Sequence, residues 1–157
     1  MKRMNQRQIN EANEALVTYA DDYHLEDQIG YILRKAHQRA SEIFFTIMQE
    51  YGFSPTQFST LIKLHDFRET SQNRLGRLVA MDPATTLGVV SRLKKQGLIA
   101  QRNDPRDRRR LLLRLTPEGL DKVETMRKVA KRVSDETLKA LNPAEQQSLQ
   151  QLLRKIS

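Results

Sequence analysis

Cysteine is absent from the 157-residue chain, which excludes disulfide bonds, thiolate metal sites and thiol-based redox sensing. Histidine is scarce as well. The three histidines, His24, His37 and His65, are scattered and lack the H-x-x-x-H spacing that would place two metal ligands on one helical face. The sequence therefore gives no reason to expect a bound metal or another cofactor.

Long hydrophobic runs are also missing. No apolar run approaches the roughly 18 residues that a membrane-spanning helix needs. The first eight residues are basic, but no continuous apolar stretch follows them, so no signal peptide is predicted. We therefore expect a cytoplasmic protein that does not contact a membrane. Because the chain also lacks paired catalytic carboxylates, a nucleophile motif and a glycine-rich phosphate loop, we do not expect an enzyme.

Positive charge is what the chain has in excess, and nearly all of the excess lies in one segment. The whole chain has a formal charge of +8, and residues 92–114, with nine basic and two acidic residues, account for +7 of it. Such a block either stays in water or meets an anion, and nucleic acid is the polyanion most often bound in this way. A solvated charge run on an ordinary surface is the alternative.

Hydrophobic periodicity predicts one mainly helical domain with dimerisation arms. A hydrophobic fraction of 38% indicates a modest core, which suits a chain that hides part of its apolar surface by pairing with a second copy. Helix starts are marked by Ser, Asp, Thr or Asn followed by proline. The expected helices cover residues 26–51, 55–67, 72–79, 82–96, a long segment from 117 and a final segment from 143, after a loose amphipathic arm at residues 1–24. Two short helices followed by a hairpin around a basic loop are typical of a winged helix-turn-helix.

The helix predicted at residues 82–96 has one apolar side and one side suited to a DNA groove. We expect Thr86, Val89, Val90 and Leu93 to pack on the preceding short helix. The opposite side is small near its start and basic near its end, which suits entry into a major groove. Its DNA-binding candidates are Ala84, Thr85, Leu87, Gly88, Ser91, Arg92 and Lys95. Gly88 in the middle of this helix costs about 1 kcal/mol of stability relative to alanine. Either another backbone comes close to the helix at this position, or the glycine has no functional role.

The basic loop at residues 102–110 is the more specific signal. We expect Asp104 and Asp107 to hold its shape by bonding backbone amides or by pairing with a neighbouring arginine. An arginine at such a loop tip fits a narrow minor groove, where the potential is most negative, while other arginines bind phosphates. The candidates for these contacts are Arg106, Arg108, Arg109 and Arg110.

Three motifs, VSRLKKQGLI at residues 90–99, DPRDRR at 104–109 and LTPEG at 115–119, together resemble the MarR family of bacterial transcription regulators. The resemblance covers roughly residues 26–157. It implies a mainly α fold, a winged helix-turn-helix with a two-stranded β-wing, whose N- and C-terminal helices interlock in a homodimer. It further implies a single domain at 25–157, with a DNA-binding lobe at about 54–116 and dimerisation helices at about 25–51 and 117–157, and it leaves the arm at 1–24 to the dimer region. In the family, the minor-groove arginine corresponds to Arg109, and the structural Asp–Arg pair involves Asp107.

The resemblance also implies a ligand site between the dimer region and the DNA-binding lobe. If the helices at 26–51 and 55–67 pack as in the family, the side chains that converge there are Arg34, His37, Ser41, Phe45, Phe58 and His65. Aromatic walls with a few cationic groups suit an aromatic carboxylate, and MarR-like proteins often respond to such acids or to their coenzyme A thioesters. The alternative is that the phenylalanines belong to the core and the histidines are satisfied by neighbours. Since cysteine is absent, the peroxide-sensing branch of the family is excluded.

Two functions agree with these observations. The first is a homodimeric regulator, most simply a repressor, that binds a pseudo-palindromic operator in double-stranded DNA and is released by a small aromatic acid or its coenzyme A thioester. The second is a non-specific architectural DNA-binding protein without a ligand, for which the charge block alone would suffice. The helix face with small residues favours the first function.

Overall fold

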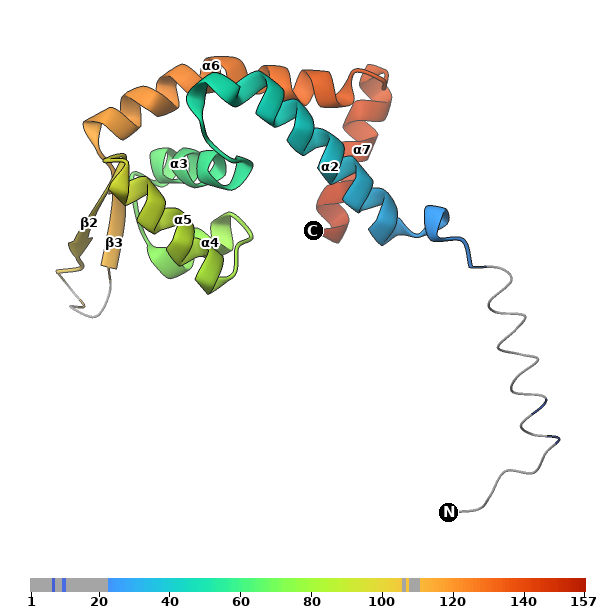
Figure 1. The fold of residues 1–157 in the computed structure, drawn as a ribbon, viewed down its shortest axis with the longest axis horizontal. Coiled ribbons are helices and arrows are strands. Elements are labelled where there is room, and N and C mark those ends of the chain that lie inside the picture. The colour runs from blue at the N-terminus through green and yellow to red at the C-terminus, as the bar shows by residue number, and fades with distance from the viewer. Residues whose placement is uncertain (1–6, 8–9, 11–22, 106, 108–110) are drawn as a thin grey trace. The chain divides into compact units, whose positions relative to one another are not determined.

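The structure is a computed structural model that describes residues 7, 10, 23–105, 107 and 111–157 (Figure 1). It comprises two compact units, Met1–Gln38 and Arg39–Ser157. The boundary between them falls inside helix α2 (Ile29–Met48), and most of the proposed arm at residues 1–24 lies outside the described residues. The division into a DNA-binding lobe and dimerisation helices stays a prediction.

Three helices form a helix-turn-helix and its support, within one residue of the predicted positions: α3 (Pro55–Phe67), α4 (Gln72–Leu78) and α5 (Pro83–Lys95). Each begins sharply because the side chain of the preceding residue accepts a hydrogen bond from the backbone N–H three residues on. These N-caps are Ser54, Ser71 and Asp82. Pro55 and Pro83 occupy first-turn positions, where a helix needs no N–H donor.

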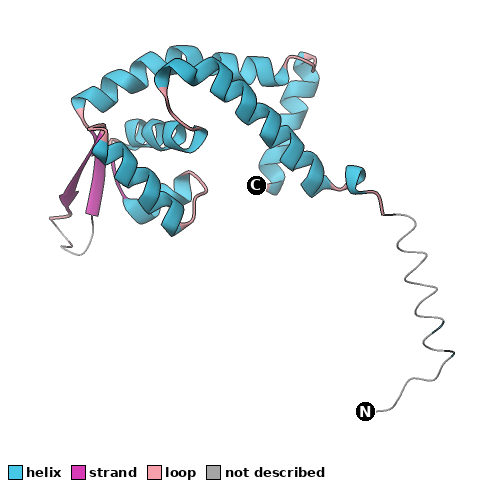
Figure 2. Ribbon diagram, viewed as in Figure 1, coloured by secondary structure: helices cyan, strands magenta, loops and turns pink. Residues whose placement is uncertain are grey.

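A small antiparallel sheet lies beside these helices, and Figure 2 shows its strands gathered in one place. The hairpin of β2 (Ile99–Asn103) and β3 (Leu111–Leu115) confirms the predicted wing. A third strand, β1 (Glu69–Ser71), pairs with the other edge of β3, so the strand order is β1-β3-β2. The two-strand expectation omits β1, because three residues between two helices are too few to show an alternating pattern.

The helices and the sheet share one hydrophobic core with α6 (Pro117–Leu138). Helical periodicity would turn Leu120, Val123 and Met126 of α6 inward; Val123 and Met126 are fully buried, whereas Leu120 is 45% exposed. On α3, Leu61 and Leu64 are fully buried, whereas Phe58, Ile62 and His65 are only half-buried. The core also contains Met48, Leu75, Val89, Val90, Leu93, Leu98, Ile99, Leu113 and Leu115.

The last helix, α7 (Pro143–Ile156), buries none of its residues. Its apolar side chains are exposed by 37% to 66%: Leu149, Leu152, Leu153 and Ile156. In α2 only Ile43, Phe44 and Met48 are buried. Two short 3-10 turns, η1 (Leu25–Asp27) and η2 (Gln49–Tyr51), flank α2. Among the described residues, no helix has the length and apolar character needed to cross a membrane.

Candidate nucleic-acid interface and ligand cavities

The helix α5 is held in place by a close contact with α4. A Cβ atom on Gly76 would lie 2.6 Å from the Thr86 hydroxyl, so the two helices approach as closely as a glycine allows. Thr86, Val89, Val90 and Leu93 are buried, which confirms the predicted inward side of α5. The opposite side presents the predicted DNA-binding candidates of this helix to solvent, with Leu87 exposed by 58% and Gly88 half-buried.

The start of α5 carries a carboxylate that is already engaged. Asp82 Oδ1 accepts a hydrogen bond from the Thr85 N–H at 2.9 Å, and Asp82 Oδ2 accepts one from the Thr85 hydroxyl at 2.5 Å. These hydrogen bonds lower the pKa of Asp82 below its ordinary value, with the Thr85 hydroxyl as the largest cause. The Thr85 side chain is therefore committed to the cap, and its methyl group is the part left for a groove.

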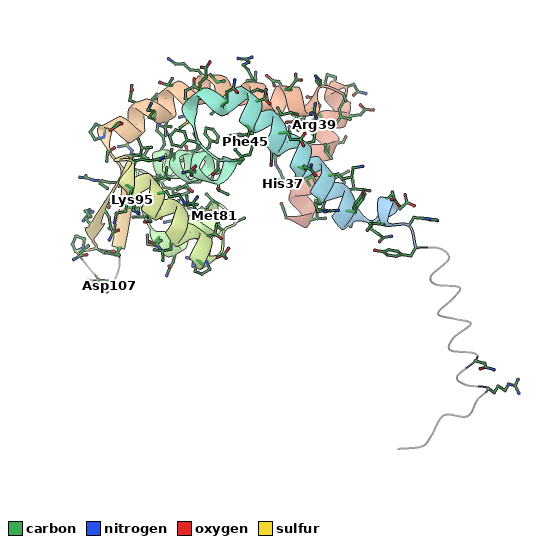
Figure 3. The ribbon with its side chains drawn as sticks, in the orientation of Figure 1. His37, Arg39, Phe45, Met81, Lys95 and Asp107 are labelled. Atoms are coloured by element: carbon green, nitrogen blue, oxygen red, sulfur yellow. The ribbon has the colours of Figure 1, made fainter. Side chains whose placement is uncertain are left out.

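The end of α5 is basic, and its three cations are not equivalent. Lys94 Nζ donates a hydrogen bond to Gln101 Oε1 of β2 at 2.5 Å, which ties the helix to the hairpin. Arg92 and Lys95 are exposed and make no such contact with a described residue. Figure 3 shows Lys95 at the end of α5 beside the strands. The cations available for DNA are therefore Arg92 and Lys95, the two predicted to reach it.

The hairpin loop is closed by its two aspartates. The Asp107 N–H donates a hydrogen bond to the Asp104 carbonyl oxygen at 3.3 Å, and Asp107 lies at the hairpin tip (Figure 3). This contact joins backbone atoms alone, and the shaping role expected of the two carboxylates stays a prediction. The candidate arginines of the loop lie outside the described residues: Arg106, Arg108, Arg109 and Arg110.

One arginine of the basic block has an internal partner that the sequence did not indicate. Arg102 Nε donates to Glu69 Oε1 at 2.8 Å, and Arg102 Nη2 donates to Glu69 Oε2 at 2.6 Å. The pair joins residues 33 positions apart, because Glu69 lies in strand β1. No motif in the sequence predicts that strand. The charge of Arg102 is thus balanced within the protein, although it counts toward the +7 of the block.

The six residues proposed for ligand binding do not form one described site. Arg34 and His37 are exposed and belong to the unit that ends at Gln38, where the Arg34 guanidinium lies 5.3 Å from the centre of the Tyr31 ring. Ser41 is half-buried in the other unit. Phe58 packs in the core against Phe44, with ring centres 5.6 Å apart, as the core alternative predicted.

Phe45 lines a cavity of about 660 Å³ between the end of α2 and the start of α3. Its ring is 53% exposed and meets Phe44 edge to face at 6.0 Å. The polar groups around this cavity are largely occupied, because Ser54 and Gln57 bond each other in the capping box of α3. The cavity therefore offers an aromatic wall without a cation among its lining residues.

His65 lines a different cavity, of about 570 Å³, at the other end of α3. Its remaining lining consists of Leu64, Asp66, Arg68, Arg114, Leu115 and Leu120. Neither Arg68 nor Arg114 forms an ion pair with a residue that the structure describes. Arg68 also has a φ of 58°, a conformation that non-glycine residues rarely adopt and that often occurs at binding sites. Two guanidinium groups of this kind beside leucines are suited to an anion with an apolar body.

His65 contacts two residues of α6 through its two ring nitrogens. Arg127 Nη1 lies 3.3 Å from His65 Nδ1, and arginine can only donate, so Nδ1 accepts. The Nε2–H then donates to Glu124 Oε1 at 3.1 Å. His65 thus lies between α3 and α6, and it connects the wall of the cavity to the long helix.

Comparison with known proteins identifies relatives across most of the chain. The sequence model of the MarR family matches residues 53–111. The HTH-type transcriptional repressor NicR of Pseudomonas putida is 36% identical over 134 residues, which are 85% of each protein.

Two solved structures resemble the fold closely. A probable transcriptional regulator from Pseudomonas aeruginosa has 42% identity and a TM-score of 0.82, over 85% of this chain and 100% of that one. BpsR of Bordetella bronchiseptica has 39% identity and a TM-score of 0.82, over 85% of this chain and 96% of its own. The DNA binding of BpsR is regulated by 6-hydroxynicotinic acid.

Proposed function

The chain belongs to the MarR family of transcription regulators, and from this we propose that it is a homodimeric repressor released from its operator by a small hydroxylated aromatic carboxylate. The observation that carries the DNA-binding part is the exposed side of α5, which has small residues first and exposed cations last, next to a wing hairpin. A helix with this face is suited to a major groove, and a basic hairpin is suited to the adjacent minor groove.

In this proposal each part of the basic block has its own task. Arg92 and Lys95 reach base edges or phosphates, and Leu87 contacts a thymine methyl group. Arg109 enters the minor groove, and the other loop arginines bind phosphates. Because the protein is a dimer, its two α5 helices read half-sites about one helical turn apart in a pseudo-palindromic operator.

We place the effector in the cavity that His65, Arg68 and Arg114 line. A carboxylate there meets two guanidinium groups, and its ring lies against Leu115 and Leu120. A volume of about 570 Å³ accommodates a single hydroxylated ring, such as that of 6-hydroxynicotinic acid, the acid that regulates the relative BpsR. A coenzyme A thioester remains the second candidate, since the cavity is open to solvent and cationic.

The place of this cavity suggests how the effector acts. Arg114 belongs to β3, the second strand of the wing hairpin, and Leu120 belongs to the first turns of α6. A ligand that binds both elements prefers one arrangement of the wing relative to α6. It thereby shifts the population of dimers away from the arrangement that fits DNA.

Operator binding is tested first, by fluorescence anisotropy with a duplex selected from a random-sequence library and with a scrambled duplex of the same composition. We expect the selected duplex to bind at least about 1000-fold more tightly, with log affinity falling linearly against log salt concentration. Discrete protected half-sites in a footprint distinguish this result from the uniform protection of an architectural protein. Equal affinity for both duplexes would refute the repressor.

The effector is tested by thermal unfolding and by release of the selected duplex. We expect 6-hydroxynicotinic acid to raise the unfolding temperature and to release DNA, and nicotinic acid and a coenzyme A thioester to act more weakly. The variant Arg114→Gln should lose both responses, whereas Lys122→Gln, an exposed change on α6, should keep them. A ligand that stabilises the protein but leaves the DNA complex intact would contradict the inducer role.

A further inference from the structure

The ion pair between Glu69 and Arg102 crosses the sheet from one edge strand to the other. In the strand order β1-β3-β2 the two residues are not on neighbouring strands. Glu69 lies opposite Arg114 of β3, and Arg102 lies opposite Leu112 of β3. Edge strands of a three-stranded sheet are about 10 Å apart, so only two extended side chains passing over β3 can meet.

The pair connects two parts of the DNA-binding surface that the backbone joins only indirectly. Glu69 lies in the segment between α3 and α4, and thus belongs to the body of the helix-turn-helix. Arg102 is the second-last residue of β2, one residue before the end of the strand at the hairpin loop. Without the pair, the loop end of β2 is held by its ladder with β3, since the Lys94–Gln101 contact acts one residue further from the loop.

The geometry of the pair favours orientation more than stability. Both carboxylate oxygens are engaged, by Nε and by Nη2, and this two-point contact fixes the plane of the guanidinium group. The side chains of Arg102 and Glu69 are 46% and 28% exposed. Ion pairs this accessible to water add little to the free energy of unfolding. The hydrogen bonds that Arg102 donates to Glu69 also raise the pKa of Arg102 above its ordinary value, so the guanidinium group stays charged.

We propose that the Glu69–Arg102 pair is a strut that sets the direction of the wing, so that Arg102 is a positioning residue for DNA binding and not one of the groups that bind phosphate. The proposal rests on the proposed function, because a wing has a direction to keep only if it meets DNA. It assigns an acidic residue, Glu69, a favourable role in binding a polyanion. This is the opposite of what its charge alone predicts.

The sign of the Glu69 effect is therefore the decisive test. The strut predicts that Glu69→Gln weakens binding of the full-length dimer to the selected duplex by about fivefold, as expected for coupled neighbours. If Arg102 instead binds phosphate, the same change frees a cation near DNA, and binding stays equal or becomes tighter. Equal or tighter binding by Glu69→Gln would overturn the proposal.

Salt dependence separates a strut from a phosphate-binding role of Arg102. The strut predicts that Arg102→Gln weakens binding about as much as Glu69→Gln does, with the slope of log affinity against log salt unchanged. A phosphate-binding Arg102 predicts that the slope becomes smaller by about 0.9 for each phosphate that the variant no longer neutralises. A reduced slope for Arg102→Gln would contradict the strut.

Two double variants complete the cycle. Glu69→Gln with Arg102→Gln keeps the net charge of the wild type and should bind no more weakly than either single variant. Glu69→Arg with Arg102→Glu restores an ion pair and should recover most of the affinity, whereas a further loss would count against the strut. As a matched control, Glu136→Gln with Lys139→Gln removes an exposed pair at the C-terminal end of α6 and should leave DNA binding unchanged.

Thermal unfolding of the same variants keeps the result interpretable. The strut predicts small shifts in unfolding temperature, in line with the exposure of the pair. If a single variant unfolds at a much lower temperature than the wild type, the reversed pair Glu69→Arg with Arg102→Glu is measured in its place. Recovery of DNA affinity by the reversed pair supports the strut, and failure to recover it refutes the strut. If the wild type binds the selected and the scrambled duplex equally well, the proposed repressor function fails. The affinities of the wild type, Glu69→Gln and Arg102→Gln for the scrambled duplex then still decide the strut.

Discussion

Gly119 lies so close to Leu98 that a Cβ atom on residue 119 would stand 2.2 Å from the Leu98 carbonyl oxygen. That oxygen accepts a hydrogen bond from the Thr116 N–H at 3.0 Å, and the Thr116 hydroxyl donates to the Gly97 carbonyl at 2.7 Å. Thr116 also caps α6 by accepting from the Gly119 N–H. The first turn of α6 is therefore fastened by its backbone to the turn that precedes β2.

The first prediction concerns this junction. Gly119→Ala should lower the free energy of unfolding by about 3 kcal/mol, because the methyl group meets backbone atoms that cannot rotate away. Chemical denaturation at a fixed protein concentration measures the change. Gly30→Ala is the matched control, since no heavy atom lies within 4 Å of its added Cβ, and alanine in a helix should be neutral or stabilise by up to about 1 kcal/mol. Similar midpoints for the two variants would mean that the junction yields more easily than its geometry indicates.

Gly88 gives a prediction in which stability and DNA binding move in opposite directions. The nearest group to an added Cβ is Arg92 Nη2 at 3.6 Å, the end of a flexible side chain, so nothing in the described protein requires glycine there. Gly88→Ala should therefore stabilise the helix by about 1 kcal/mol. On the DNA-facing side of α5 the same methyl group should weaken operator affinity. Anisotropy and denaturation on one preparation measure both effects, and unchanged affinity would remove Gly88 from the DNA interface.

The cap of α5 predicts a pH dependence with a defined sign. The Thr85 hydrogen bonds lower the pKa of Asp82 below its ordinary value of 3.8, so the ionised carboxylate is the form that the fold stabilises. Its contribution is complete above about pH 4 and is lost as the pH falls through the lowered folded-state pKa. The difference in unfolding temperature between wild type and Asp82→Ala should thus be constant near neutral pH and shrink in acid.

Asp82→Asn separates the cap from the charge. Asparagine is also a good N-cap, so this variant should retain most of the stability near neutral pH, without the titration seen in the wild type. It also removes a negative charge from the helix end that approaches DNA, and operator affinity should rise at low salt. A difference between wild type and Asp82→Ala that grows in acid would contradict the assignment of the ionised cap.

Capping residues and helical periodicity predicted the helix-turn-helix well, whereas contacts between segments distant in the sequence were not predicted. The starts of α3 and α5 followed from Ser-Pro and Asp-Pro pairs, whose capping chemistry acts over three residues. The inward side of α5 followed from helical periodicity in the same way. By contrast, the Glu69–Arg102 pair depends on β1, which exists only because β3 has a free edge beside it. The proposed ligand residues Phe45 and His65 share the half-exposed pattern of many surface positions, and only the fold assigns them to two different cavities.

The exposed side of α7 gives the last prediction. Leu152 and Ile156 are 59% and 66% exposed, and a helix with its apolar residues in water is expected to pack against another surface. The proposed dimer buries this side against a second copy, so Leu152→Glu should place a charge in the interface and shift the protein to monomers. Sedimentation equilibrium measures the shift. Operator affinity should fall with it, because one protomer holds only one half-site.

Gln151→Glu provides the matched control for this dimer test, since it adds the same charge at the neighbouring exposed position of α7. It should leave both association and operator binding close to those of the wild type. Circular dichroism of both variants verifies that the helices are retained, so that a loss of association is not confused with unfolding. A Leu152→Glu protein that stays dimeric would show that α7 does not form the interface. A monomer that still binds the full operator with wild-type affinity would refute the recognition of two half-sites by a pair of protomers.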